Sequence, residues 1–168
     1  VRKLPAILSA ANGEKHFYNK DILELRSNGT SSVLCECDPN DLSWLYIPES
    51  TYKAHRIIYT GNFSPANNSL LGHRSSCTVE FSGICSYEEM TEELKALPGN
   101  LKPIAFNNEP NSYVIQDSKT RGLIQEYKDY LSTFGVHLLG RFAEWEYYNM
   151  DKAMEAAFRL QTVLINKR

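Results

Sequence analysis

Residues 139–151 gather side chains that could bind an anion or a cofactor in one strand-to-helix connection. Asn149 can cap the following helix, and the free N–H groups near Met150 would face a ligand at the positive end of the helix dipole. Gly140 allows a bound group to approach the backbone, and the Arg141 fork can donate two hydrogen bonds to a diphosphate. The same residues would also suit an aromatic-rich connection that fills one edge of the core, and the local pattern favours neither interpretation.

No other segment carries a catalytic motif. The sequence contains no G-x-G-x-x-G, no G-x-x-x-x-G-K-[ST] and no G-x-S-x-G. The histidines stand singly, at His16, His55, His73 and His137. We therefore predict that this chain contains no catalytic residue.

The four cysteines favour burial over metal binding. Cys35 and Cys37 lie two apart in a strand-like run, so both side chains would point to one face. A zinc site needs a second close pair, and Cys77 and Cys85 do not supply one. We predict buried thiols in a reducing compartment and no metal site.

Strand-like runs occur before the helices that must pack against them. Alternating or β-branched runs predict strands over 44–47, 55–60 and 76–81. A hairpin is predicted from 21–26 and 31–37 around a tight turn at 27–30, and two strands over 102–106 and 112–115. A capping box from Ser86 to Glu89 predicts one helix. Apolar residues at helical spacing predict two more, over 123–134 and 150–165.

This order predicts an α+β fold: a mostly antiparallel sheet with flanking helices. The last strand and helix, over 136–139 and 150–165, stand apart from the sheet pattern. They resemble the closing strand-helix piece of a separate Rossmann-like domain.

Composition limits the kinds of partner that we expect. The 168 residues include 18 Lys and Arg against 20 Asp and Glu, a formal net charge of -2 with the signs interspersed. That balance gives no reason to expect nucleic acid as a partner. The chain begins at Val1 without a signal-peptide pattern, and no apolar run approaches the ~20 residues of a membrane-spanning helix. We expect a cytoplasmic protein without a membrane span.

Three motifs in order resemble the UDP-galactopyranose mutase family. The first is W-L-Y-I-P-E from Trp44, followed by His55-Arg56 and by G-N-F-S-P-A-N from Gly61. The second is Tyr113-Val114-Ile115. The third runs over 139–158, with a Gly-Arg pair, an aromatic-rich stretch and a long helix. Together they cover most of the chain from Trp44 onward and are specific for flavin amine-oxidase-like proteins.

The resemblance implies a fold, a cofactor and a reaction. The family binds FAD on a Rossmann-like domain and interconverts UDP-galactopyranose and UDP-galactofuranose through a flavin–sugar adduct. Residues 1–135 would then be the sheet domain on the substrate side, and residues 136–168 would belong to the FAD-binding domain. The chain would be a C-terminal fragment that is inactive alone.

The resemblance also implies roles for individual residues. Arg56 and Arg141 would neutralise the diphosphate of the nucleotide-sugar substrate, and Tyr113 and Tyr147 would donate hydrogen bonds to it. The pocket for the nucleotide-sugar would be lined by Trp44 and Tyr46. Gly140, Arg141, Asn149 and Met150 would lie against the FAD.

Four substitutions depart from the family pattern and leave other functions open. Asn149 stands where many members have an acid, His55 replaces an aromatic residue, Phe63 replaces a Tyr, and Val114 replaces a Pro. One alternative is a fragment of a flavin amine oxidase or protoporphyrinogen oxidase-like oxidoreductase. Another is a module that binds a nucleotide-sugar or a partner and performs no chemistry.

Overall fold

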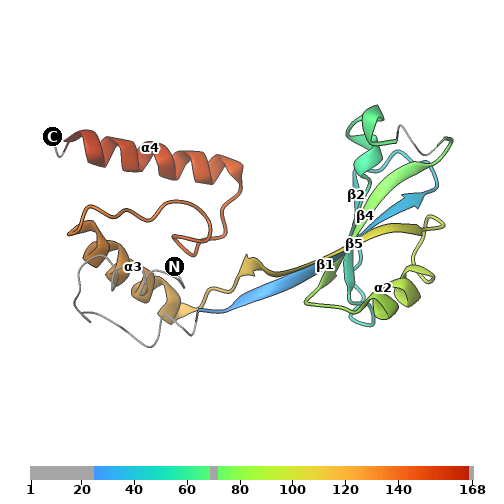
Figure 1. Cartoon of the computed structure of the whole chain (residues 1–168), viewed down its shortest axis with the longest axis horizontal. Coiled ribbons are helices and arrows are strands. Elements are labelled where there is room, and N and C mark those ends of the chain that lie inside the picture. The colour runs from blue at the N-terminus through green and yellow to red at the C-terminus, as the bar shows by residue number, and fades with distance from the viewer. Residues whose placement is uncertain (1–24, 69–71, 167–168) are drawn as a thin grey trace. The chain divides into compact units, whose positions relative to one another are not determined.

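The structure is a computed structural model that describes residues 25–68 and 72–166. The chain forms two compact units, whose elements are labelled in Figure 1. We call Asn28–Tyr113 the sheet unit. We call Val1–Ser27 with Val114–Arg168 the helical unit, described over 25–27 and 114–166. The boundary predicted at residue 135 would leave residues 114–135 with the sheet, whereas this division places them in the helical unit. That residues 136–168 belong to a cofactor domain stays a prediction.

The sheet unit is built on five strands in the order β2-β3-β4-β1-β5. Their bounds are Ser27–Cys37 for β1, Trp44–Tyr46 for β2, Ala54–Ile58 for β3, Ser75–Ser82 for β4 and Lys102–Val114 for β5. β2 pairs antiparallel with β3, β3 with β4, and β4 with β1. Short 3-10 turns at Thr60–Asn62 and Pro65–Asn68 precede β4. The predicted α+β fold with a mostly antiparallel sheet is confirmed.

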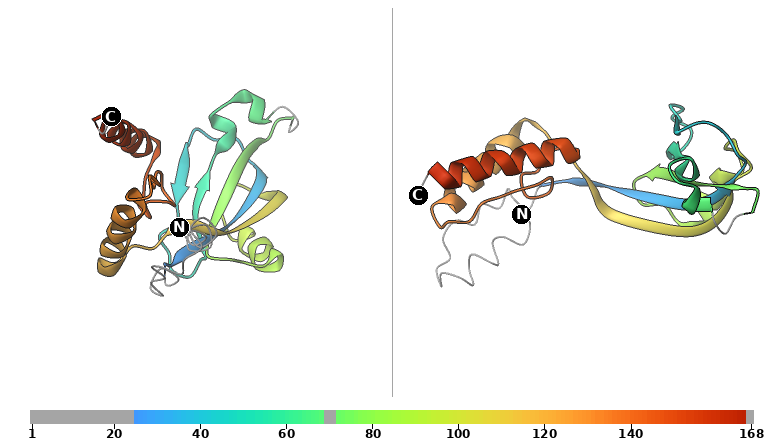
Figure 2. Two further views of the ribbon diagram at one scale, coloured as in Figure 1. Left: turned by 60° about the vertical axis from the view of Figure 1, so that its left-hand side comes forward. Right: turned by 90° about the horizontal axis from the view of Figure 1, so that it is seen from above.

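Alternation along the strands gives the sheet one buried face and one open face. Val33, Ile57 and Val79 pair across three strands and are fully buried. Helix α2 (Tyr87–Leu94) covers this face by packing Met90 and Leu94 against the same core (Figure 2). The predicted capping box forms at the start of α2. The hydrophobic effect therefore fixes which side chains of each strand remain on the open face.

The four cysteines are free thiols on the buried side. Cys35 pairs with Cys77 across β1 and β4, and Cys37 lies in the same core. The prediction that they are buried is confirmed.

The turn predicted at 27–30 is wrong, because these residues begin strand β1. A Cβ on Gly29 would lie 2.7 Å from the Ile84 side chain and 3.2 Å from the Glu109 carbonyl oxygen. Gly29 therefore marks a close approach of neighbouring chain segments, not a turn. From Ser31 onward β1 pairs with β4. Of the hairpin strand expected over 21–26, residues 21–24 lie outside the described residues.

The two strands predicted over 102–106 and 112–115 form one continuous strand, β5. It is an edge strand beside β1, and most of its residues are exposed. Polar residues and proline are tolerated on an edge, where one row of backbone groups has no strand to pair with. Residues 107–111, the polar stretch between the two predicted strands, are therefore extended as part of β5.

The helical unit contains α3 (Ser118–Ser132) and α4 (Met150–Asn166). Both helices are predicted by their apolar spacing, and α3 buries Ile124, Tyr127 and Leu131 as expected. The strand predicted at 136–139 is wrong. A strand needs a neighbour for its backbone hydrogen bonds, and among the described residues no strand pairs with this segment.

None of the helices within residues 25–68 and 72–166 has the length and apolar character needed to cross a bilayer.

Candidate functional site

The open face of the sheet carries a row of polar side chains across four strands. Tyr46 on β2 pairs with Arg56 on β3, which pairs with Glu80 on β4. Glu80 in turn pairs with Ser32 on β1. Paired residues point to the same face, so sheet register alone places an arginine, a phenol and a carboxylate side by side.

Arg56 is held at the centre of this row by Glu80. Its Nε donates to Glu80 Oε2 at 2.8 Å, and its Nη2 donates to the same oxygen. Burial works against the charge of Arg56, but Glu80 and then the Tyr46 hydroxyl outweigh it and raise the pKa of Arg56. Arginine has five N–H groups, so these contacts fix the guanidinium and leave donors for a ligand.

Glu80 keeps its charge in spite of being half-buried. The His55 imidazole, whose Nε2 lies 3.6 Å from Glu80 Oε2, and then the Arg56 guanidinium hold the pKa of Glu80 below its usual range. A ligand phosphate would therefore approach an arginine whose positive charge is already balanced by the Glu80 carboxylate. Two or more phosphate charges would compete better for Arg56 than one.

The other two site residues predicted for the sheet unit also lie near Arg56. Tyr113, at the end of β5, is close enough to act electrostatically on the Arg56 guanidinium. Trp44 is one row further along β2, opposite Ile58, and is 52% exposed. The structure thus pairs Tyr46 with Arg56, places Trp44 beside them on the open face, and leaves Tyr113 within electrostatic range of the guanidinium.

The G-N-F-S-P-A-N segment next to this face is held by its own amides. Asn62 donates to the Asn40 and Leu42 carbonyls at 2.8 and 2.7 Å. Asn68 accepts the Ser76 N–H at 2.9 Å, and a Cβ on Gly61 would lie 2.3 Å from Asn68 Oδ1. The glycine and the asparagines therefore shape the loop before β4, and their role is structural.

The helical unit holds the other predicted residues in the connection before α4. The Arg141 Cζ lies 4.5 Å from the centroid of the Tyr147 ring and 6.0 Å from that of Phe142. Stacking on an aromatic face orients a guanidinium. From the sequence, this segment could be an anion site or an aromatic-rich connection that fills one edge of the core. In the structure it is a connection in which an aromatic ring orients the arginine.

Gly140, Asn149 and Met150 frame this connection. Gly140 has a φ of 94°, and a Cβ there would meet no atom within 4 Å. Its N–H donates to Glu144 Oε2 at 3.1 Å. Asn149 precedes α4 and accepts the Ala153 N–H at its carbonyl, while Met150 is 85% exposed. The backbone at Gly140 and the start of α4 are open to a planar group, which fits a flavin. Their contact with FAD stays a prediction.

Sequence reasoning missed the carboxylates and the amide that hold the predicted residues. Glu80 holds Arg56, Glu144 holds Gly140, and Gln116 bonds to the backbone of Trp145. Alternation along β4 places Glu80 on the open face, but only the register shows which residue it faces. Within the described part of the chain, no three His, Cys, Asp or Glu side chains gather to hold a metal ion.

No protein-family model and no curated protein sequence matches this chain. The fold of this chain occurs among solved structures. A reduced UDP-galactopyranose mutase aligns with 17% identity and a TM-score of 0.63, over 74% of this chain and 30% of the mutase chain. A chain from Exiguobacterium sp. 255-15 designated a protoporphyrinogen oxidase aligns with 10% identity and a TM-score of 0.54, over 81% of this chain and 34% of that one. The chain thus has a fold found in both proteins and spans about a third of their length.

Proposed function

We propose that this chain is part of a flavoenzyme of the UDP-galactopyranose mutase type, and that it supplies side chains that bind the diphosphate of a nucleotide-sugar. The observation that carries the proposal is the cluster of Tyr46, Arg56 and Glu80 on the open face of the sheet unit. The shared fold with a reduced UDP-galactopyranose mutase supports it, as does the order of the three sequence motifs.

The cluster on the sheet unit suits a diphosphate because of its charge and its hydrogen-bond donors. Arg56 is fixed by Glu80 and keeps further N–H groups for phosphate oxygens. Tyr46 pairs with Arg56 across the strands and Tyr113 acts on it electrostatically, so both phenols are proposed to donate to the same phosphates. The exposed Trp44 offers an apolar surface for the base or the sugar beside it.

The helical unit would make a second contribution of the same kind. Arg141, stacked on Tyr147, is proposed to donate to phosphate oxygens, and the Tyr147 hydroxyl to do so beside it. The open backbone at Gly140 and the start of α4 are proposed to lie against FAD. When bound in its reduced form, FAD would supply the nucleophile for exchange at the anomeric carbon of the sugar. The protein residues bind and orient the substrate and hold the departing UDP by its charge.

The proposal is tested on the full-length protein that contains this chain. We expect purified protein to carry flavin, visible by its absorbance, and to interconvert UDP-galactopyranose and UDP-galactofuranose after reduction with dithionite. Arg56→Met should lower the turnover while flavin content stays unchanged. A colourless protein that fails to convert either sugar would overturn the proposal.

The likeness to the chain designated a protoporphyrinogen oxidase favours a second candidate, a flavin-dependent oxidoreductase. Such an enzyme would consume oxygen with its substrate and would have no need for UDP. The two arginines with phenolic neighbours favour the nucleotide-sugar. Oxygen uptake during turnover, together with no detectable binding of UDP, would favour the oxidase.

A further inference from the structure

Trp145 has an unusual backbone conformation in the middle of the connection before α4. Its φ is 53°, in the left-handed region that bulky residues rarely occupy. The side chain is 5% exposed and packs with Ile124 and Tyr127, and its indole N–H donates to the Ile115 carbonyl at 3.3 Å. A strained conformation of this kind persists only where the surroundings fix it.

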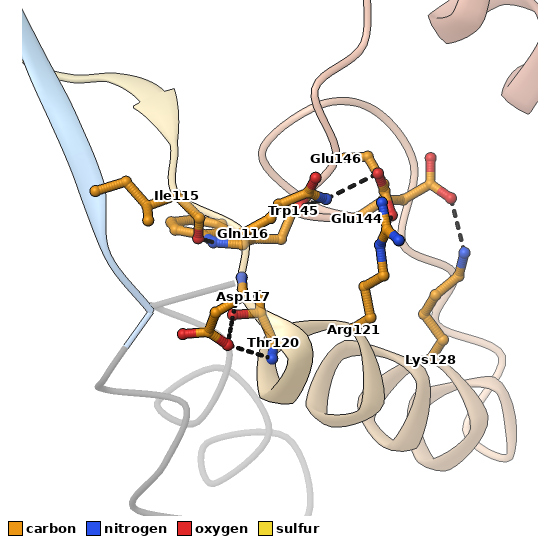
Figure 3. A network of polar contacts seen from close by, with 9 residues as sticks. All are labelled: Ile115, Gln116, Asp117, Thr120, Arg121, Lys128, Glu144, Trp145 and Glu146. Atoms are coloured by element: carbon orange, nitrogen blue, oxygen red, sulfur yellow. Dashed lines mark hydrogen bonds and ion pairs between the residues drawn. The ribbon is translucent and has the colours of Figure 1, made fainter.

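Gln116 fixes the backbone at this point. Its amide Nε2 donates to the Trp145 carbonyl oxygen at 2.8 Å and to Glu146 Oε2 at 2.8 Å. Figure 3 shows the Gln116 side chain extending toward both residues from the segment just before α3. The two N–H groups of one amide thus hold two consecutive residues, with Trp145 in its left-handed conformation.

Ion pairs hold the residues on either side of Trp145. Glu144 is 8% exposed and accepts from Lys128 Nζ at 2.7 Å and from the Gly140 N–H at 3.1 Å. Glu146 Oε1 lies 3.6 Å from Arg121 Nε. Lys128 and Arg121 are both on α3, so the three residues 144–146 are tied to α3 or to the segment that leads into it (Figure 3).

The fixed residues lie between the two side chains that the proposed function assigns to the diphosphate. Arg141 precedes them and Tyr147 follows them, with the Arg141 Cζ 4.5 Å from the Tyr147 ring centroid. The Glu146 N–H also donates to the Arg141 carbonyl at 3.0 Å. A change of φ at Trp145 would redirect the chain between Arg141 and Tyr147 and would separate the pair.

We propose that Gln116 is a positioning residue: by holding Trp145 and Glu146, it sets the stacking of Arg141 on Tyr147 and thereby the affinity for the diphosphate. This inference rests on the proposed function, because the ligand of Arg141 comes from there. Gln116 acts through Trp145 and Glu146, which lie between Arg141 and Tyr147 in the chain.

Three variants separate positioning from general packing. Gln116→Met keeps the length of the side chain and removes both hydrogen bonds. Gln116→Lys restores a donor that can bond the Trp145 carbonyl and pair with Glu146. Gln125→Met is the matched control, because Gln125 is an exposed amide on α3 that donates to Asp129 Oδ1 at 2.9 Å.

The first readout needs no ligand. In the 168-residue chain, the Arg141 Nε–Hε signal in the nuclear magnetic resonance spectrum should be displaced by the ring current of Tyr147. We expect Gln116→Met to lose this displacement, and Gln116→Lys and Gln125→Met to keep it. A displacement that is unchanged in Gln116→Met would overturn the inference. Should Gln116→Met fail to fold, Gln116→Glu, which has the same length but no N–H donor, takes its place with the same expected loss.

The second readout is the affinity of the full-length protein for UDP, measured by calorimetry. We expect Gln116→Met to weaken the binding roughly tenfold, since misplacing one charged donor pair removes its hydrogen bonds. Gln116→Lys should recover most of the affinity. Equal affinities for UDP in Gln116→Met and the unaltered protein would overturn the inference and leave the proposed function standing. If the unaltered protein binds no UDP, the proposed function fails and the inference fails with it.

Discussion

The two compact units keep their side chains in place by different forces. In the sheet unit, strands and α2 share one apolar core that includes Val33, Phe81 and Met90. In the helical unit, a smaller apolar cluster that includes Tyr127 and Trp145 is joined by hydrogen bonds and ion pairs from Gln116 and Lys128. Apolar packing is not directional, whereas hydrogen bonds specify geometry. We infer that the sheet unit carries more of the stability and that the helical unit positions side chains.

Helix α4 shows how few side chains the helical unit buries in places. Among its described side chains only Ala156 is buried, while Met150, Phe158 and Ile165 are exposed by 85%, 67% and 61%. Removing an exposed side chain costs little free energy, and removing a buried one costs a great deal. The same substitution in the two units should therefore have very different effects on unfolding.

The largest expected effect comes from a pair of phenylalanines. Phe81 is 1% exposed in the sheet core, and its replacement by Ala should lower the free energy of unfolding by about 3–5 kcal/mol. Phe158→Ala on α4 should change it by less than about 0.5 kcal/mol. Denaturant unfolding followed by circular dichroism measures both. Equal losses in the two variants would break the comparison.

Cysteine labelling in the sheet unit and methionine oxidation in both units provide a second comparison. Burial raises the pKa of Cys37 to about 12, and a hydrogen bond with Cys35 together with burial raises the pKa of Cys77. We expect thiol labelling of the folded chain at mildly alkaline pH to be roughly a thousandfold slower than labelling in denaturant. Rapid labelling of the folded chain would show that the core of the sheet unit opens easily.

The methionines serve as the matched test on the same sample. Met90 is 2% exposed in the sheet unit, whereas Met150 and Met154 on α4 are 85% and 59% exposed. Hydrogen peroxide should therefore convert Met150 and Met154 to the sulfoxide well before Met90. Mass spectrometry of the digested chain reads out all three. Equal oxidation rates would contradict the difference in burial.

A smaller difference is expected in acid. A carboxyl whose pKa is lower in the folded chain stabilises the fold above its unfolded pKa, and this contribution is lost as the pH falls through the folded pKa. Glu80 is such a group, through His55 and then Arg56. Asp117 is another, through Thr120, but its side chain is 47% exposed and better screened by water.

We therefore expect Glu80→Gln to reduce the acid dependence of stability more than Asp117→Asn does. The measurement is the free energy of unfolding from neutral pH to below the ordinary pKa of glutamate. Asp117→Asn is a suitable control because asparagine still caps a helix. An acid dependence that survives Glu80→Gln but disappears in Asp117→Asn would reverse the assignment.

Much of the fold could be predicted from local patterns. The capping box at Ser86, the alternation that buries Val79 and Phe81, and the apolar spacing of α3 and α4 each act within a few residues. Gly29 shows the limit of such patterns. It is needed because a Cβ there would crowd the Glu109 backbone, and not because the chain turns. The strand expected over 136–139 shows another, since apolar character alone does not create a partner strand.

The candidate site could be predicted only in its parts. Arginines and tyrosines in recognisable motifs point to Arg56, Tyr113, Arg141 and Tyr147. Glu80 is 24 residues from Arg56, and Gln116 is 29 residues from Trp145. Strand register and loop path decide such contacts, and neither leaves a local signal in one sequence. The left-handed φ of Trp145 has no sequence signature at all.

The most direct test of the account is a titration of the full-length protein with UDP, comparing Arg56→Met and Arg141→Met with the unaltered protein. Each arginine is proposed to make charge-assisted hydrogen bonds to the diphosphate, so each variant should bind UDP about tenfold or more weakly. Arg159→Met, which removes an exposed arginine of α4 that pairs with Glu155, is the control and should bind with nearly unchanged affinity. Unchanged affinity in both Arg56→Met and Arg141→Met would contradict the account.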